Sequence, residues 1–285
     1  MILKIPPFRI LIKKPNPLLF LLTVLLSMGC KDEAKKTSKA VQSEIVYQDL
    51  SEAEKLVDEA IDHSGGMSNW ATKKTLSYTK NIQSYDSTGT LLRTVAQVHK
   101  YRLKPSFKAN ISWELDGNKH KIINNGRQSW KLVNGKIQDN KAAVNNAWNS
   151  SFGSQYMISM PFKLKAPGTI LDYEGIDTLS NNRIVHKLKV TYEKGAGSSG
   201  GMHTWYYFLN TDNYQFEANF LDHGKGFSYT DYETFVEVDG IAVTKERKTY
   251  GSNENMETTY LKTIYSNSDI RFDVALPEEL FKVNN

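Results

Sequence analysis

Cysteine is almost absent from this sequence, because Cys30 is the only cysteine in 285 residues. A single thiol cannot form a disulfide bond within its own chain, so disulfide bonds do not stabilise the fold. Small secreted domains often need such cross-links. The residues after Cys30 are numerous enough to bury a hydrophobic core without them, and the sequence therefore predicts one domain that is stabilised by packing.

Acidic residues are absent from positions 1–29, which carry four basic residues and then an apolar run. That run, Leu18 to Gly29, is too short to span a bilayer, which needs about 20 residues. Basic residues, a short apolar run and small residues before a cleavage point are typical of a secretory signal. Because the signal holds most of the formal net charge of +5, the remaining chain is nearly neutral, and nucleic acid binding has no electrostatic support.

The cysteine directly follows this predicted signal. The residues Ser27-Met28-Gly29-Cys30 resemble the lipobox of bacterial lipoproteins, in a relaxed form similar to that of Bacteroidetes. The resemblance implies that residues 1–29 are removed and that Cys30 carries acyl chains, which would attach the protein to a membrane. Two or more acyl chains make such an attachment stable. A plain secretory signal followed by a chance cysteine is the alternative.

The residues after Cys30 resemble a sorting signal. Lys31, Asp32 and Glu33 are similar to the acidic export signal that surface-exposed lipoproteins of Bacteroidetes carry at this place, which implies display on the cell surface from the outer membrane. The periplasmic face of the outer membrane is the alternative. Residues 30–49 are mostly polar and rich in lysine, and this composition is typical of a flexible tether.

Residues 50–285 predict a mainly β domain that begins with one helix. Ser51 and Glu54 form a capping-box pattern, and apolar residues at helical spacing continue to Gly65-Gly66, where glycine favours a helix end. The segments that follow alternate between apolar and polar residues and are separated by turn signals such as Asp239-Gly240, which predicts an antiparallel sheet. The predicted strands are 75–85, 92–103, 107–115, 119–125, 128–134, 184–192, 203–210, 214–220, 227–238, 241–250 and 258–266.

One segment, 141–160, interrupts this alternation. Its apolar and small residues fall at helical spacing, and they predict one or two short helices packed across the sheet. The residues of this stripe are Val144, Ala147, Trp148, Ser151 and Phe152. An irregular lid is the alternative.

Aromatic residues are the strongest candidates for binding a ligand, since the sequence holds 15 Tyr, 12 Phe and 5 Trp. A concave sheet lined with rings would bind an apolar ligand. Packing of the same rings in an ordinary core is the alternative. The candidate ligand-binding residues are Phe107, Ile111, Trp113, Trp130, Trp148, Phe152 and Trp205.

Motifs for catalysis or metal binding are weak. The segment 195–201 matches motifs for nucleotide binding and for a catalytic serine, but both motifs need a helix after them, and the run that follows is β-type. His203, His223 and Asp222 could form a zinc site, although their spacing matches no zinc motif. We therefore predict no catalytic residue, cofactor or metal site, and keep a metal-dependent hydrolase that uses strand histidines as an alternative function.

The order of the elements resembles the LolA/LolB-like lipoprotein-carrier superfamily. The resemblance rests on the helix ending His63-Ser64-Gly65-Gly66, the segment Leu209–Gln215 and the ending Ser268–Pro277, and the architecture is similar to uncharacterised outer-membrane lipoproteins of Bacteroidetes. It implies an antiparallel half-open β-barrel. An N-terminal helix and short central helices would cover its concave face, which holds acyl chains.

The same resemblance implies a function without catalytic residues. The protein would be a lipid-anchored envelope protein that binds a hydrophobic ligand, an acyl chain or lipid, or a lipoprotein. Its partners would be that ligand, the membrane through the anchor at Cys30, and an envelope protein. A surface adhesin-like module with a filled core and no cavity is a further alternative.

Overall fold

The computed structural model describes residues 50–197 and 200–283. The predicted signal, the lipidation site Cys30, the sorting residues Lys31, Asp32 and Glu33, and the tether lie outside the described residues. None of the helices within the described ranges is long and apolar enough to cross a membrane.

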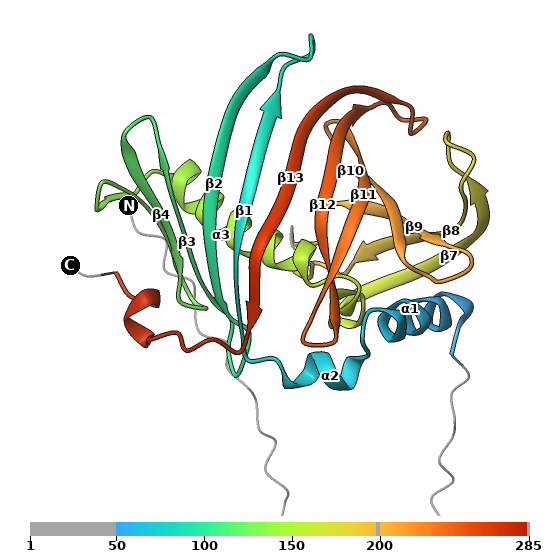
Figure 1. Ribbon diagram of the computed structural model, residues 1–285, viewed down its shortest axis with the longest axis horizontal. Helices are drawn as coiled ribbons and strands as arrows, with labels where there is room; N and C mark the ends of the chain where they lie inside the picture. Colours follow the sequence, from blue (N-terminus) through green and yellow to red (C-terminus); the bar gives the residue numbers. More distant parts are fainter. Residues whose placement is uncertain (1–49, 198–199, 284–285) are drawn as a thin grey trace, which may run out of the picture. The chain divides into compact units, whose positions relative to one another are not determined.

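A single 13-stranded sheet forms most of the described chain, and it curves around an interior (Figure 1). The sheet order is β6-β5-β4-β3-β2-β1-β13-β12-β11-β10-β9-β8-β7, with antiparallel pairing between neighbours throughout. Its two edge strands, β6 and β7, do not pair with each other, so the barrel is open. The predicted fold class, an antiparallel half-open β-barrel with few helices, is confirmed.

The strands and helices have the following bounds. The strands are β1 (Thr75–Tyr85), β2 (Leu91–Arg102), β3 (Lys108–Leu115), β4 (Asn118–Asn124), β5 (Ser129–Val133), β6 (Lys136–Gln138), β7 (Thr169–Thr178), β8 (Ile184–Tyr192), β9 (Thr204–Asn210), β10 (Phe216–Asp222), β11 (Phe227–Val238), β12 (Ile241–Ser252) and β13 (Thr258–Phe272). The helices are α1 (Glu52–His63), α2 (Met67–Thr72), α3 (Lys141–Ile158), and the 3-10 helices η1 (Phe162–Lys165) and η2 (Glu278–Phe281).

The N-terminal helix forms as its sequence predicts. The Ser51 side chain accepts a hydrogen bond from the Glu54 backbone N–H, and the Glu54 carboxylate accepts one from the Ser51 backbone N–H, which completes the capping box. The helix ends before Gly65, whose φ of +105° favours glycine. A Cβ at Gly65 would lie 1.9 Å from the Gly240 carbonyl oxygen, so glycine also allows α1 to dock on the β11–β12 turn.

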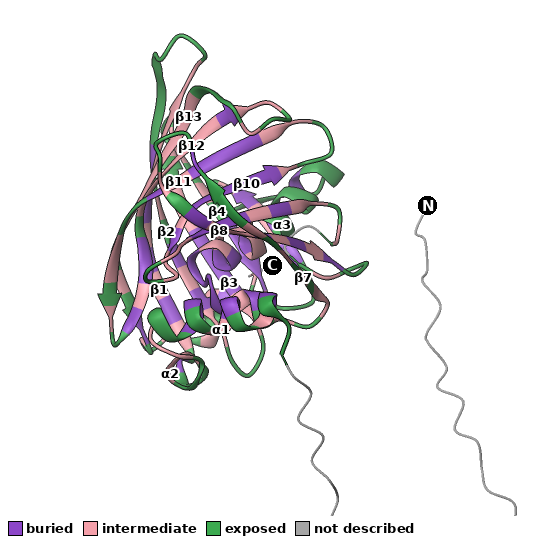
Figure 2. Ribbon diagram, turned by 90° about the vertical axis from the view of Figure 1, so that its right-hand side faces the viewer, coloured by how far each residue is buried: buried purple, intermediate pink, exposed green. Residues whose placement is uncertain are grey.

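Most of the buried hydrophobic residues lie inside the curve of the sheet, at the end that α1 and α2 cover (Figures 1 and 2). Trp70 of α2 stacks on Phe162 of η1 with ring centroids 4.6 Å apart and meets the edge of the Phe272 ring. A smaller cluster lies apart from this core around Phe208, Phe220 and Tyr229. Packing therefore fills one end of the interior.

One predicted strand does not keep a single apolar face. The pairing of β10 with β9 shifts register between Phe216 and Ala218, which marks a β-bulge. Phe216 consequently joins the main core, whereas Ala218 and Phe220 join the smaller cluster. The prediction that these residues of segment 214–220 share one face was wrong for this reason.

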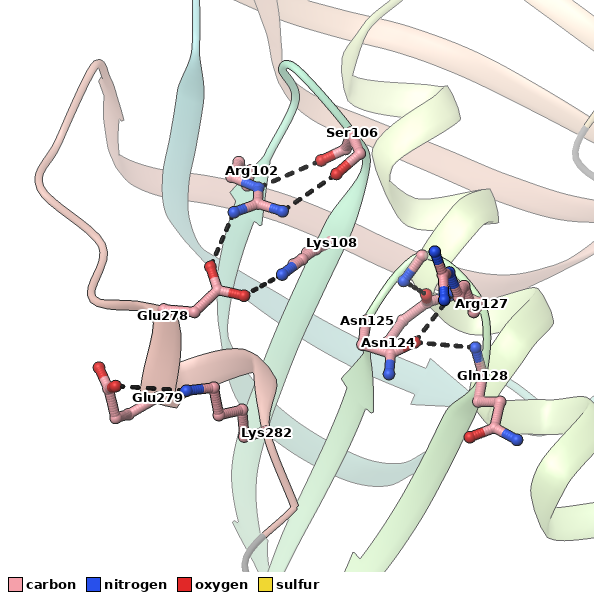
Figure 3. A network of polar contacts seen from close by, with 11 residues as sticks. Arg102, Ser106, Lys108, Asn124, Asn125, Arg127, Gln128, Glu278, Glu279 and Lys282 are labelled. Atoms are coloured by element: carbon pink, nitrogen blue, oxygen red, sulfur yellow. Dashed lines mark hydrogen bonds and ion pairs between the residues drawn. The ribbon is translucent and has the colours of Figure 1, made fainter.

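The C-terminal helix η2 is held against β2 and β3 by polar contacts (Figure 3). The Glu278 carboxylate accepts hydrogen bonds from Arg102 Nη1 at 2.7 Å and from Lys108 Nζ. Asn110 Nδ2 donates to the Leu280 carbonyl oxygen at 2.6 Å. These contacts join the C-terminal segment to strands that lie about 170 positions earlier in the chain.

Candidate ligand-binding cavity

A cavity of about 630 Å³ lies between α3 and the concave face of the sheet. Its wall comes from both halves of the sheet, since β1 to β5 contribute on one side and β9, β10, β12 and β13 on the other. The apolar part of the lining consists of Ile82, Val95, Ile111, Trp113, Leu115, Ile122, Met157, Trp205 and Leu221. The cavity therefore occupies the part of the interior that the core under α1 leaves unfilled.

Helix α3 presents two different stripes. Its N-cap, Asn140, accepts a hydrogen bond from the Ala143 backbone N–H at 2.9 Å, and the buried small residues Ala147 and Ser151 face the sheet. Ser151 Oγ accepts a hydrogen bond from Asn124 Nδ2 of β4 at 3.0 Å. The stripe that faces the cavity is instead mostly small and polar, and it ends at one apolar residue, Met157. Its other residues are Asn146, Asn149, Ser150, Gly153 and Ser154.

The seven aromatic and aliphatic candidates fall into separate places. Ile111, Trp113 and Trp205 line the cavity together. Phe107 stacks on Phe152 with centroids 4.4 Å apart, and Phe152 contacts Trp148 at 4.9 Å, outside the cavity lining. Trp148 also lines a separate hollow of about 480 Å³ together with Trp130. The structure thus brings three of the seven together, and their ligand-binding role stays a prediction.

Trp113 and His120 form part of the wall between two hollows. Their rings stack at 5.0 Å, nearly parallel, and both residues line the cavity as well as a neighbouring hollow of about 500 Å³. The pairing of β2 with β3 ends at Val98 and Ser112. Beyond that point side chains, and not backbone hydrogen bonds, separate the cavity from the neighbouring hollow.

The cavity carries positive charge. Among the described residues, its lining includes Lys80, Arg93, Lys131 and Arg247 but no aspartate or glutamate. Lys80 is 9% exposed, and burial together with the nearby Arg247 lowers the pKa of Lys80 to about 7. Sequence reasoning missed these residues. The sequence did contain one indication of Lys80, because the alternation of β1 places it on the same inward face as Tyr78 and Ile82.

Buried polar side chains lie beside Lys80. His99 Nδ1 is 2.7 Å from the Tyr101 hydroxyl, and His99 Nε2 is 3.1 Å from Gln97 Oε1. Burial, with a smaller contribution from Lys80, holds the pKa of His99 well below its usual range. His99 is therefore a neutral hydrogen-bonding group at neutral pH and adds no charge to the cavity.

The residues of the alternative zinc site lie near one another without forming one. The rings of His203 and His223 are 5.4 Å apart and perpendicular. His223 Nε2 is hydrogen-bonded to Ser228 Oγ at 3.0 Å, and Asp222 Oδ1 accepts the Gly224 backbone N–H at 2.6 Å. Within residues 50–197 and 200–283, no group of three or more His, Cys, Asp or Glu side chains is placed to hold a metal ion.

Two solved structures are similar to this chain in fold. A LolA superfamily protein from Nitrosomonas europaea aligns with a TM-score of 0.52 and 11% identity, over 82% of this chain and 98% of that chain. A DUF1329 family protein from Desulfovibrio piger aligns with a TM-score of 0.50 and 13% identity, over 82% and 98% of the two chains. These likenesses show a LolA-like fold, which confirms the resemblance at the level of fold.

Comparison of sequences gives the family of the chain. No curated protein sequence matches it. The sequence model of one protein family matches residues 14–269, which is most of the chain. The chain therefore belongs to DUF6503, a family of unknown function.

Proposed function

We propose that this protein binds the acyl chain of a lipid or lipoprotein in the cavity between α3 and the sheet, and that it acts by binding and not by catalysis. The cavity itself carries the proposal. Its volume of about 630 Å³ falls within the range of about 300–1,000 Å³ that is typical of small-molecule sites. A filled-core adhesin would have no need of such a space.

The composition of the lining supports an elongated, mostly apolar ligand. Ile82, Trp113 and Met157 are only partly buried and line the cavity, so apolar surface remains open there. Apolar surface in a cavity gains free energy when an apolar ligand covers it, at about 25 cal/mol per Å². The sequence resemblance to lipoprotein carriers and the LolA-like fold support the same class of ligand.

The proposal includes a place in the cell envelope. A lipid anchor at Cys30 would hold residues 50–285 as a binding domain at the outer membrane, with residues 30–49 as the tether. Lys31, Asp32 and Glu33 would direct it to the cell surface, and the periplasmic face is the alternative. An envelope protein that delivers or accepts the ligand would be the second partner.

A probe with a fluorescent acyl chain and an uncharged head group tests the binding function. The full chain, expressed with its own signal and carrying Cys30→Ser, should bind the probe saturably in detergent-free buffer. Val95→Trp fills the cavity and should weaken binding by tenfold or more. Leu92→Trp is the matched control, because Leu92 lies on the same strand and is 64% exposed.

Two outcomes would contradict the proposal. The probe could fail to bind the parent chain although circular dichroism shows a folded β protein, or both tryptophan variants could bind it as well as the parent. Metal analysis of the same sample separates the proposal from the hydrolase alternative, since a stoichiometric zinc content would favour the latter.

A further inference from the structure

Two cations on the concave face have no carboxylate partner. Lys80 on β1 and Arg247 on β12 both line the cavity, and none of the ion pairs among residues 50–197 and 200–283 includes either. Both cations lie beside the ring of Tyr265, with Lys80 Nζ 4.7 Å and Arg247 Cζ 4.5 Å from its centroid. A tyrosine ring attracts a cation only modestly, so it does not neutralise the pair.

Two cations on the opposite face of the same sheet, Lys248 and Arg183, are paired with carboxylates. Lys248 follows Arg247 on β12 and therefore points to the other face, where its Nζ lies 3.2 Å from a Glu233 carboxylate oxygen. Arg183 Nη2 lies 2.9 Å from Asp231 on that side, and Asp231 is the register partner of Lys248. The lack of carboxylates is thus a property of the cavity and not of the sheet as a whole.

Burial makes the unpaired charge of Lys80 costly. Lys80 is 9% exposed, and a buried charge destabilises a protein unless a partner compensates it. Burial and the nearby Arg247 lower the pKa of Lys80, as expected for a cation that lacks a counter-charge. An anion bound beside both side chains would remove the repulsion between them and restore full protonation of Lys80.

A second kind of unsatisfied group lies in the same lining. Trp205 is 7% exposed and lines the cavity, and its Nε1 has no hydrogen-bond partner within the described part of the chain. The indole N–H can only donate. This nitrogen has almost no accessible surface, so a ligand in the cavity does not reach it, and the polar recognition comes from Lys80 and Arg247.

We infer that the cavity binds an amphiphile with one anionic head group, a carboxylate or a phosphate, whose head lies against Lys80 and Arg247. The acyl chain then follows the apolar wall of Val95, Ile111 and Ile122. A guanidinium holds two oxygens of such a head group at once, and charge-assisted hydrogen bonds of this kind are about twice as strong as neutral ones. The inference rests on the proposed acyl-chain function and adds the chemistry of the head group.

Ligands that share one acyl-chain length and differ in the head group test the inference. Dodecanoate, dodecyl phosphate, methyl dodecanoate and inorganic phosphate each compete with the uncharged acyl probe on the full chain that carries Cys30→Ser. We expect at least one of the two anionic amphiphiles to displace the probe at a concentration tenfold or more below that of the neutral ester. The better anion identifies the source as a fatty acid or a phosphorylated lipid, and inorganic phosphate should not displace the probe.

Three variants test whether Lys80 and Arg247 cause the preference for anionic head groups. Lys80→Met and Arg247→Met keep the aliphatic stems and remove the charges. Each should weaken binding of the anionic amphiphile by about tenfold, as expected for the loss of a hydrogen bond to a charged group. Both should weaken binding of the neutral ester much less than binding of the anion. Lys245→Met is the control, because Lys245 is exposed on the same strand and lies outside the cavity lining, and melting curves confirm that each variant is folded.

The outcomes separate this inference from the proposed function. If the neutral ester and both anions bind the parent chain equally, or if the two methionine variants bind the anions as the control does, the head-group inference is wrong while acyl-chain binding stands. Displacement by inorganic phosphate alone would contradict an amphiphile as the ligand. If neither the probe nor any amphiphile binds, the proposed function itself fails.

Discussion

Gly153 offers a substitution for which an open cavity and a packed core predict opposite results. It lies within α3 and lines the cavity, and a Cβ built on it meets no other heavy atom within 4 Å. Leucine is favoured over glycine in a helix interior by about 0.8 kcal/mol. In a chain of this size that gain raises the melting midpoint by about 2–3 °C. Insertion of a leucine into a packed core would instead cost about 1–3 kcal/mol.

Gly153→Leu should therefore stabilise the ligand-free protein and weaken acyl-chain binding, since the new side chain occupies part of the cavity. Differential scanning fluorimetry measures the first effect and displacement of a fluorescent acyl probe the second. Asn145→Leu is the matched control, because it also improves helix propensity but lies on the exposed side of α3. A fall in the melting midpoint, or an unchanged probe affinity in a folded Gly153→Leu variant, would refute the open cavity.

Three further predictions concern the anchor, its sorting signal and the buried lysine. Cys30→Ser should move the protein from the membrane fraction to the soluble fraction, and a variant that stays in the membrane would contradict lipidation. Alanine at Asp32 and Glu33 should leave acylation intact but reduce cleavage by protease added to whole cells, whereas equal cleavage would reduce these residues to part of the tether. The pKa of Lys80 is lowered from 10.5 to about 7 in the folded protein. Between these pH values Lys80 is protonated in the unfolded chain but mostly neutral in the folded one, so the free energy of unfolding should rise with pH across this window. Denaturant titrations of Lys80→Met should show a flatter rise, and identical slopes would contradict the buried, uncompensated position of this amine.

The sequence predicted the strands well where one face is buried and the other is solvated. The segment that contains Ile111 and Trp113 shows this alternation, and both residues do point into the interior. Edge strands gave a weaker signal. Strand β7 was missed because it borders the sheet, buries little, and carries a register shift between Tyr173 and Gly175. Strand β6, with three residues, and the six-residue helix α2 are too short for a recognisable period.

The central segment was predicted as a helix, and the ligand-binding role of its aromatic stripe stays a prediction. Trp148 and Phe152 follow helical spacing, but neither lines the cavity. Phe152 stacks on Phe107, and Trp148 contacts Phe152 at a tilt. Small polar residues such as Ser150 face the cavity instead. Apolar spacing alone finds the stripe that packs, and it gives no signal for the stripe that faces an open space. The structure has one long helix here, followed by η1, in place of one or two short helices.

The cationic pair could not be found from the sequence, because it depends on contacts between distant segments. Lys80 and Arg247 approach each other only because β1 pairs with β13 and β13 pairs with β12. Tyr265, which lies between them, is the register partner of Ile82 on one side and of Arg247 on the other. A lysine in a strand is ordinarily expected to face solvent, so the inward position that the alternation of β1 indicates for Lys80 was overlooked.

Native mass spectrometry of the protein purified from its own cells shows whether the fold holds a lipid. The chain carrying Cys30→Ser has no covalent lipid, so any added mass that is lost on denaturation reports a ligand held by the fold. We expect a bound amphiphile with an acyl chain, at close to one per protein chain, and its loss in the Gly153→Leu variant. A folded protein that carries no lipid under these conditions, and takes up none when mixed with envelope lipid extract, would contradict acyl-chain binding.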